Sequence, residues 1–177
     1  MKKIFLFFPF IIFFIFVIIF FYFLIIDRDP SEIPSALIQK NVPVFTTSSL
    51  FEKNEFISTR EFGEQITIVN FFASWCTPCR IEHSYLKRLS EDKKIKIIGI
   101  NYKDDPQLAI EWLEEKGNPY NNVAVDSNGQ IAINWGVYGI PETFIVNTNK
   151  IVLHRIVGPI TEKKLDELYS IINKNTQ

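Results

Sequence analysis

The sequence predicts an α/β domain with a largely parallel sheet, preceded by one long apolar helix. Three observations lead to this prediction. No charged residue occurs between Ile4 and Ile26. The β-branched and aromatic run Ile66–Phe72 has the length and continuity of a strand buried on both faces. Two consecutive strand-and-helix units, which begin at Ile66 and at Ile95, imply parallel strands joined by crossovers.

Composition limits the classes of function. The 177 residues include 19 Lys and Arg and 20 Asp and Glu, for a net charge of −1. Because basic residues are interleaved with acidic ones and form no concentrated patch, we expect no nucleic-acid partner. About 150 residues follow the apolar run, which is enough for one domain with one core. Two cysteines exclude a small fold that depends on many disulfides.

The apolar run predicts a membrane anchor. As a helix, Ile4–Ile26 spans about 34 Å, and a bilayer's hydrocarbon core is about 30 Å thick. A cleaved signal peptide is the alternative, but its apolar part is usually about 7 to 15 residues and ends in small residues. We therefore predict an uncleaved transmembrane helix at residues 1–26. Lys2 and Lys3 precede the run, so the positive-inside rule keeps the N-terminus cytoplasmic and exports the domain.

Residues 27–41 show no sustained period and contain Pro30 and Pro34 among polar residues, which predicts a tether. Such a tether holds the domain at 42–177 near the bilayer, and its partners are then membrane-bound or membrane-adjacent. Short strands at Val42–Phe45 and around Glu55–Ile57 are expected to form an N-terminal β extension.

The order of the remaining elements predicts the fold. Apolar residues recur at helical spacing after Cys79, and a second helix can start at Pro106 and stop at Gly117. The other expected elements are a strand at Val123–Val125, a short helix at Ile131–Trp135, a hairpin of Glu142–Val146 and Ile151–Val157, and a closing helix at Thr161–Ile172. A β-α-β-α core followed by β-β-α is a thioredoxin-like order, here with a central insertion.

Cys76 and Cys79 lie at the predicted strand-to-helix junction. On the first turn of a helix, residues three apart are neighbours, and the free N–H groups and positive dipole end favour a thiolate. We expect Cys76, at the more exposed end, to attack a substrate disulfide and Cys79 to resolve the mixed disulfide. An inert bridge is disfavoured because a four-residue loop gains little from cross-linking.

Other chemistries of the cysteine pair are disfavoured. A structural zinc site needs four ligands, and beyond the two cysteines the chain offers only His83 and His154. Covalent haem attachment needs His directly after the second cysteine, where Arg80 stands. We therefore expect no metal and no bound cofactor, only a redox-active disulfide. His83 lies four residues after Cys79 on the predicted helix, but a position on the helix surface explains it equally well. We place His154 on a solvent face of the hairpin.

Two further features belong to the predicted site. Glu82 follows Cys79 by three residues, so it either exchanges a proton with that thiol or is a solvated helix residue; spacing leaves both open. Pro141 begins a strand, where a cis X-Pro bond can be built, and such a turn opposite the cysteines would free the backbone of Ile140 to pair with an extended peptide. By local rules alone the stretch is only a Gly/Pro turn. We expect Trp75, Tyr138 and Ile140 to bind substrate, although core or rim packing explains Trp75 equally well.

With Trp75–His83, Asn101–Asp105, Gly117–Tyr120 and Gly136–Phe144 in this order, the chain resembles the CcmG/DsbE family of membrane-anchored thiol:disulfide interchange proteins. The stretch Gly136–Phe144 is the most discriminating part. The resemblance implies that Cys76 attacks, Cys79 resolves, Pro141 is the cis-proline and Glu82 is the active-site acid. Ordinary thioredoxins carry a buried Asp where this chain has Asn70, which is consistent with Glu82 taking the carboxylate role.

The resemblance also implies a cellular role. The domain would face the periplasm from the inner membrane, receive electrons from a membrane transporter of the thiol-reducing type, and reduce apocytochrome c or an intermediary thiol protein during cytochrome c maturation. Two alternatives remain. The same fold can act as an oxidant, and a binding protein can present apocytochrome with the cysteine pair as a covalent latch.

Overall fold

The structure is a computed structural model that describes residues 4–25 and 36–175. These residues belong to two separate units, one holding the N-terminal helix and the other holding every later element. The helix α1, Ile4–Ile25, contains Pro9. Its described side chains, from Phe8 to Leu24, are exposed except for the half-buried Val17. Over the described part of the chain, no helix combines the length and the hydropathy that crossing a membrane requires.

The chain joins the second unit before residue 42, where the sequence predicted the last part of a tether. The first nine residues of that predicted segment, 27–35, lie outside the described residues. Gln39 N donates to Val152 O at 2.8 Å, and Val152 N donates to Lys40 O at 2.9 Å. Leu37 and Ile38 are half-buried against the core. The six residues 36–41 are too few to show a helical or strand period, so the sequence could not predict that they pack against the domain.

The N-terminal extension is a two-stranded antiparallel sheet of β1, Thr46–Ser48, and β2, Phe56–Ser58. The strand predicted at Val42–Phe45 is wrong in position. Pro43 has no N–H to donate there, and the residues preceding Thr46 lie outside any strand. Val42 and Phe45 are nevertheless buried in the core, which explains their apolar character.

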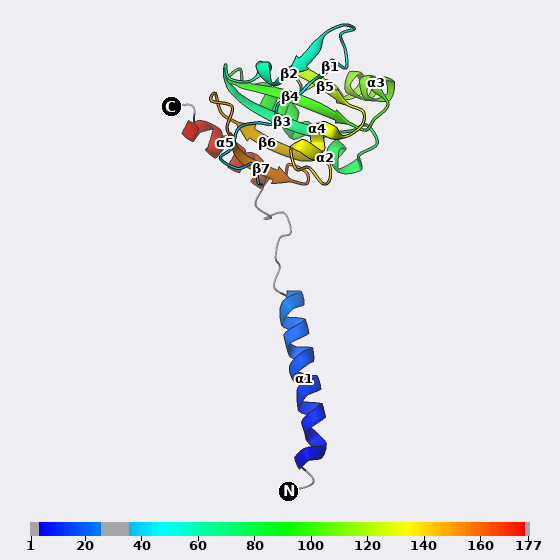
Figure 1. Ribbon diagram of the computed structural model, residues 1–177, viewed down its shortest axis with the longest axis vertical. Helices are drawn as coiled ribbons and strands as arrows, with labels where there is room; N and C mark the ends of the chain where they lie inside the picture. The colour runs from blue at the N-terminus through cyan, green and yellow to red at the C-terminus, as the bar shows by residue number, and fades with distance from the viewer. Residues whose placement is uncertain (1–3, 26–35, 176–177) are drawn as a thin grey trace. The chain divides into compact units, whose positions relative to one another are not determined.

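A five-stranded sheet forms the centre of the domain, in the order β5-β4-β3-β6-β7 (Figure 1). The strands are β3 Ile66–Phe72, β4 Ile95–Tyr102, β5 Asn122–Asp126, β6 Glu142–Val146 and β7 Val152–Val157. As predicted, β3 and β4 are parallel, and β6 and β7 form an antiparallel hairpin. The short strand β5 was expected without a direction, and it is parallel to β4. All seven residues of the central strand β3 are buried, which matches its continuous apolar run.

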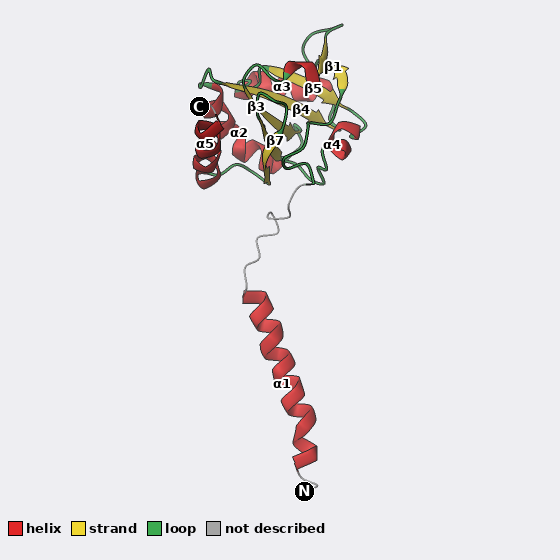
Figure 2. Ribbon diagram, turned by 60° about the vertical axis from the view of Figure 1, so that its left-hand side comes forward, coloured by secondary structure: helices red, strands yellow, loops and turns green. Residues whose placement is uncertain are grey.

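Helices cover both faces of this sheet. They are α2 Thr77–Ser90, α3 Pro106–Lys116, α4 Gln130–Asn134 and α5 Glu162–Asn175, with the short 3-10 helix η2 at Thr59–Glu61. Figure 2 shows α2 and α5 on one side of the strands and α4 on the other. Alternate residues of β3 feed the two cores: Ile68 and Phe72 pack with α2, α3 and α5, whereas Val69 and Phe71 pack with α4 and the N-terminal extension.

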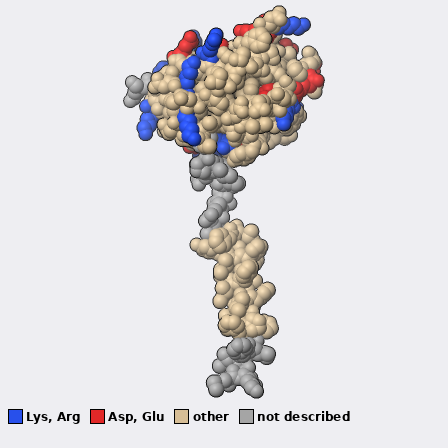
Figure 3. Space-filling view, viewed as in Figure 1, with Lys and Arg blue, Asp and Glu red and all other residues tan. Residues whose placement is uncertain are grey.

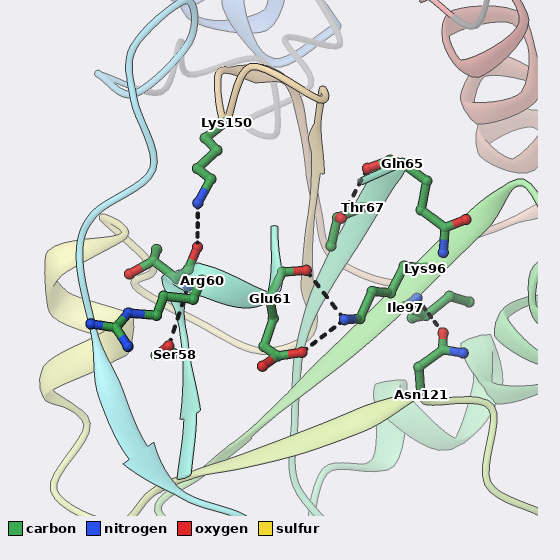
Figure 4. Close-up of polar contacts among 10 residues, drawn as sticks. Ser58, Arg60, Glu61, Gln65, Thr67, Lys96, Ile97, Asn121 and Lys150 are labelled. Carbon is green, nitrogen blue, oxygen red and sulfur yellow. Dashed lines mark hydrogen bonds and ion pairs between the residues drawn. The ribbon is translucent and has the colours of Figure 1, made fainter. Parts of the chain in front are cut away.

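Polar contacts fasten the N-terminal extension and the insertion to the central strands (Figure 4). Lys96 Nζ on β4 lies 2.9 Å from Glu61 Oε2 and donates to Glu61 O at 3.2 Å. Lys150 Nζ donates to Thr59 O at 3.1 Å. Ile97 N donates to Asn121 Oδ1 at 2.7 Å, and Asn121 N donates to Ile97 O at 2.8 Å. This last pair holds the chain just before β5 in a single register against β4.

Candidate active site

The cysteine pair stands where the central strand passes into α2. Cys76 is the N-cap of α2, and its Sγ accepts a hydrogen bond from Cys79 N at 3.2 Å. Pro78 lies in the first turn, where a missing N–H costs nothing because that group has no partner within the helix. Cys76 and Cys79 form a disulfide with a Cα–Cα distance of 5.3 Å. The predicted placement of the pair at the N-terminal end of α2 is confirmed, with Cys76 as the N-cap and Cys79 in the first turn.

The predicted difference in exposure between the two cysteines is absent in this oxidised form. Cys76 is 3% exposed and Cys79 is 2% exposed. The two residues differ instead in position, because Cys76 lies outside the first turn with extended backbone and Cys79 lies inside it.

The segment that precedes Cys76 is held by a carboxylate that the sequence analysis did not single out. Asp104 accepts from Ser74 N at 2.5 Å, from Ser74 Oγ at 2.8 Å and from Asn101 Nδ2 at 2.9 Å. Arg80 Nη2 donates to Ser74 O at 2.9 Å from the other side. Ser74 is therefore tied both to the loop after β4 and to α2. The sequence signal was the stretch Asn101–Asp105, which contributed to the family resemblance but gave Asp104 no role.

Trp75 projects from this tied segment toward solvent. It is 57% exposed, and its Nε1 donates to Lys103 O at 3.1 Å. Interpreting Trp75 as a core residue is thus wrong, and it lies on the surface next to Cys76. Its ring borders a hollow also lined by Ser74, Arg80, Leu108, Glu111 and Trp112.

Glu82 is completely buried, so the solvated-surface interpretation is wrong. Its Oε1 accepts from Asn70 Nδ2 at 2.8 Å, and its Oε2 accepts from Ile160 N at 2.9 Å. Burial raises the pKa of the Glu82 carboxyl from 4.5 to about 7, and the two N–H donors and the charge of Lys164 oppose that rise. A carboxyl with a pKa near 7, one turn from Cys79, is able both to accept and to return a proton at neutral pH.

Asn70 connects this carboxyl to two other elements. Its Nδ2 also donates to Thr143 Oγ1 on β6 at 3.0 Å, and its Oδ1 accepts from Tyr120 Oη at 2.7 Å. Burial raises the pKa of the Tyr120 hydroxyl well above 10, so the hydroxyl keeps its proton. Tyr120 and Thr143 were not predicted as site residues. A polar residue in the middle of a fully buried strand, as Asn70 is, was the available signal for such a network.

The loop around Pro141, which the sequence also predicted to belong to the site, lies beside the segment that leads to Cys76. The Ile140–Pro141 peptide bond is cis. Glu142, the first residue of β6, pairs with Phe71 near the end of β3, so the chain before β6 runs next to the chain that leads to Cys76. Ile140 is half-buried and packs against the cluster that contains both cysteines.

A buried ion pair holds this loop. Arg155 Nε on β7 donates to Glu142 Oε2 at 2.7 Å, and Arg155 Nη2 donates to Gly136 O at 3.2 Å. The Arg155 guanidinium also lies 4.7 Å from the ring centroid of Tyr138, which is 61% exposed. Tyr138 therefore lies on the surface, and the Arg155 guanidinium packs against one face of its ring. Arg155 was not predicted to take part.

The two histidines differ in their surroundings. The expectation that His83 lies on a helix surface is wrong, because it is buried, its ring packs on Trp112 with centroids 4.7 Å apart, and its Nε2 lies 2.8 Å from Gly117 O. Burial lowers the pKa of the His83 imidazole. His154 is half-exposed on β7 with its Nε2 3.1 Å from Glu167 Oε1, in line with the solvent-side placement.

Comparison with known proteins agrees with this geometry. Residues 38–172 match the Redoxin family. The chain is 42% identical over 140 residues to the thiol:disulfide interchange protein CycY of Rhizobium leguminosarum, covering 79% of this chain and 75% of the relative. It is 41% identical over 140 residues to the thiol:disulfide interchange protein DsbE of Escherichia coli, covering 78% and 75%. The chain belongs to the CcmG/DsbE family.

Solved structures confirm the thioredoxin-like fold of this family member. A DsbF homologue from Corynebacterium diphtheriae superposes with a TM-score of 0.70 at 20% identity, covering 84% of this chain and 95% of that one. StoA from Bacillus subtilis superposes with a TM-score of 0.59 at 23% identity, covering 72% and 97%. Family membership and the Cys76–Cys79 pair together make this protein a thiol:disulfide oxidoreductase.

Proposed function

We propose that this protein is a membrane-anchored reductant that acts in the periplasm on the disulfide of apocytochrome c haem-binding cysteine pairs, or on an intermediary thiol protein, during cytochrome c maturation. The observation that carries the proposal is the burial of Glu82 one turn after Cys79, with a pKa of about 7. Such a group supplies the proton acceptor that the second half of disulfide reduction needs.

The proposed reaction has two exchange steps. The Cys76 thiolate attacks one substrate sulfur, which breaks the substrate disulfide, forms a mixed disulfide and releases one substrate thiolate. Cys79 then transfers its proton to Glu82, and the Cys79 thiolate attacks Cys76 Sγ. This closes the Cys76–Cys79 disulfide and releases the second substrate thiolate, which takes up a proton from Glu82 or from water. The substrate gains two electrons, and the protein dithiol loses them.

The surface next to Cys76 supports binding of an extended, largely sequence-independent polypeptide. Trp75 and Tyr138 present exposed rings, and Ile140 contributes backbone next to the cis bond. Backbone pairing at Ile140 gives affinity with little sequence dependence, as strand addition does. No bound cofactor enters the proposed reaction, because the cysteine pair itself carries both electrons.

The anchor is proposed from the sequence of the N-terminal segment. The charge-free run extends from Ile4 to Ile26, beyond both ends of the stretch whose side chains are described. The described surface of α1 carries no Lys, Arg, Asp or Glu (Figure 3). Lys2 and Lys3 orient it with the N-terminus in the cytoplasm. Alkaline extraction of membranes tests this placement, because a spanning protein stays with the lipid and a peripheral one is released.

The reduction potential of the Cys76–Cys79 couple tests the proposed direction of electron flow. Titrated against a thiol buffer, a reductant gives a value near that of thioredoxin, about −270 mV, whereas a value near −120 mV identifies an oxidant of the same fold. Absence of a reversible couple contradicts the exchange chemistry and favours a binding protein. If the protein is a reductant, a membrane electron donor of the thiol-reducing transporter type restores its Cys76–Cys79 dithiol after each cycle.

Trapping identifies the substrate class. With Cys79→Ser, the mixed disulfide between Cys76 and a peptide containing an oxidised Cys-x-x-Cys-His segment should accumulate without turnover. Cys76→Ser is the matched control and should trap nothing, since it lacks the attacking sulfur. Unchanged cytochrome c maturation in cells that carry Cys79→Ser would contradict a catalytic role and favour the latch.

A further inference from the structure

Three buried polar side chains from distant parts of the sequence form one continuous chain of hydrogen bonds. Tyr120 Oη donates to Asn70 Oδ1 at 2.7 Å, and Asn70 Nδ2 donates to Glu82 Oε1 at 2.8 Å. Tyr120 lies in the central insertion, between α3 and β5, whereas Asn70 lies on β3 and Glu82 on α2. The insertion thus reaches the carboxyl that neighbours the resolving cysteine.

The direction of each hydrogen bond in this chain favours an ionised Glu82. Asn70 Nδ2 donates twice, to Glu82 Oε1 and to Thr143 Oγ1, and Asn70 Oδ1 is occupied by the Tyr120 hydroxyl. If the carboxamide turned over, its oxygen would face Glu82 Oε1, and only a protonated carboxyl could donate to it. With Tyr120 Oη donating to Oδ1, as in this arrangement, an N–H of Asn70 points at Glu82.

The Tyr120 hydroxyl is held in place by its surroundings. The Tyr120 ring stacks on Phe72 with centroids 4.8 Å apart and an interplanar angle of 21°. Gly99 on β4 leaves room for both rings, since a Cβ there would lie 2.9 Å from Phe72 Cε1 and 3.0 Å from Tyr120 Cγ. The next residue, Asn121, accepts from Ile97 N through its Oδ1 (Figure 4). Its backbone N–H also donates to Ile97 O. A rigid hydroxyl is what a fixed carboxamide orientation requires.

We propose that Tyr120 and Asn70 are positioning residues for the resolving step: the Tyr120 hydroxyl orients the Asn70 carboxamide so that Glu82 stays a carboxylate able to take the Cys79 proton. The inference deepens the proposed function and rests on it, because it names the residues that tune the proposed proton acceptor. It also assigns a role to the central insertion, which supplies Tyr120.

Few other charges act on Glu82. Lys164 on α5 attracts the carboxylate and lowers its pKa, while its amine donates to Val157 O and Pro159 O. The Ile160 N–H favours the ionised form from the segment that follows β7. On α2 the Cys79 thiol of the reduced protein is the exchange partner. Replacing Tyr120 by Phe changes none of these groups, so a shift in the proton affinity of Glu82 reports the Asn70 carboxamide.

The test is the pH dependence of the resolving step in the full-length reduced protein. An aromatic disulfide with a coloured leaving thiol reacts first at Cys76, and a second, concentration-independent phase follows when Cys79 closes the disulfide. Tyr120→Phe should move the midpoint of the second phase upward by about one pH unit, because the Asn70 carboxamide is no longer held by the hydroxyl and its hydrogen bond to the charged Glu82 is weakened. The second phase then slows about fivefold near pH 7 and recovers at high pH.

A double-mutant cycle separates positioning from simple destabilisation. In the Glu82→Gln background, Tyr120→Phe should cause no further shift, since the two residues act through one interaction. Equal slowing at all pH values and in both backgrounds overturns the proposal and indicates a packing role. Tyr102→Phe, which removes a hydroxyl on the opposite core of the same sheet, is the matched control and should leave the midpoint unchanged.

Two further measurements keep the outcomes distinct. The side-chain amide NMR signals of Asn70 should shift in Tyr120→Phe and stay unchanged in Tyr102→Phe.

If Tyr120→Phe folds poorly, Asn70→Asp replaces it and should shift the midpoint of the second phase upward by more than one pH unit, because two carboxylates then share the site. A wild-type protein with no second phase contradicts the proposed function itself. A normal wild-type profile with an unshifted Tyr120→Phe profile overturns the positioning role alone.

Discussion

Asn70 Nδ2 lies 2.8 Å from Glu82 Oε1, at a point where neither side chain is exposed. The contact joins the middle of the central strand to the second turn of the active-site helix. It offsets part of the cost of burying a carboxylate, and burial still leaves the pKa of Glu82 at about 7. The same contact makes the protein's stability depend on pH.

Glu82 should make the oxidised protein more stable at low pH than at high pH. Its folded-state pKa of about 7 lies above the unfolded value of 4.5, so its stabilising contribution is complete below pH 4.5 and is lost as pH rises through 7. Between pH 5 and pH 8 the free energy of unfolding should fall by about 2 kcal/mol more in the wild type than in Glu82→Gln. Urea unfolding at the two pH values measures this difference.

Glu82→Gln is the required reference because His83 also makes the stability depend on pH. Burial lowers the pKa of His83, so its contribution to the free energy of unfolding falls as pH falls. This effect is opposite in sign to that of Glu82. His83 is present in both proteins, and its contribution cancels in the comparison. Parallel stability curves for the two proteins would show that the Glu82 pKa is not raised.

Gly99→Ala should destabilise the domain by about 1 to 3 kcal/mol, because the added methyl group would lie 2.9 Å from Phe72 Cε1 and 3.0 Å from Tyr120 Cγ and would force the stacked rings to shift. Gly139→Ala is the matched control, since a Cβ at Gly139 meets no atom within 4 Å. Thermal unfolding of both variants measures the effect. Equal melting temperatures would mean that the Phe72 and Tyr120 rings shift at no cost.

Arg155→Met should destabilise the protein by about 3 kcal/mol at pH 8, because it leaves Glu142 buried without its partner. Burial raises the pKa of Glu142 and Arg155 opposes the rise, so the loss should shrink as pH falls and Glu142 takes up a proton. Arg88→Met removes an exposed ion pair with Glu162, which solvent screens, and should cost far less than Arg155→Met. Similar losses from the two substitutions would contradict the buried character of the Arg155 pair.

Asp104→Asn should destabilise the segment before Cys76 by about 1 to 3 kcal/mol. One carboxylate oxygen becomes an NH2 group, which cannot accept the hydrogen bonds that Ser74 or Asn101 donates at that position. The neighbouring change Asp105→Asn is the control, since Asp105 caps α3 and Asn caps a helix equally well. Urea unfolding compares the two variants. A larger loss in Asp105→Asn would show that Ser74 does not depend on Asp104.

Local patterns in the sequence predicted most of the fold. The buried run Ile66–Phe72, Pro106 at the start of α3 and Gly117 at its end were each recognisable without tertiary information. Prediction failed where apolar residues served contacts outside regular structure, as at Val42 and Phe45. The reason is that alternation and helical period report repeating geometry, and these residues pack from irregular backbone.

The sequence by itself determined the redox chemistry: the spacing of Cys76 and Cys79 at a strand-to-helix junction specifies two sulfurs on one helical turn. Only the tertiary structure decided how the site is tuned. Spacing left Glu82 undecided between solvent and site, and burial settled its place because β3, α2 and the chain after β7 close around it. Tyr120, Asp104 and Arg155 act across 50, 30 and 13 residues respectively. Such contacts are set by packing between elements, which no local pattern records.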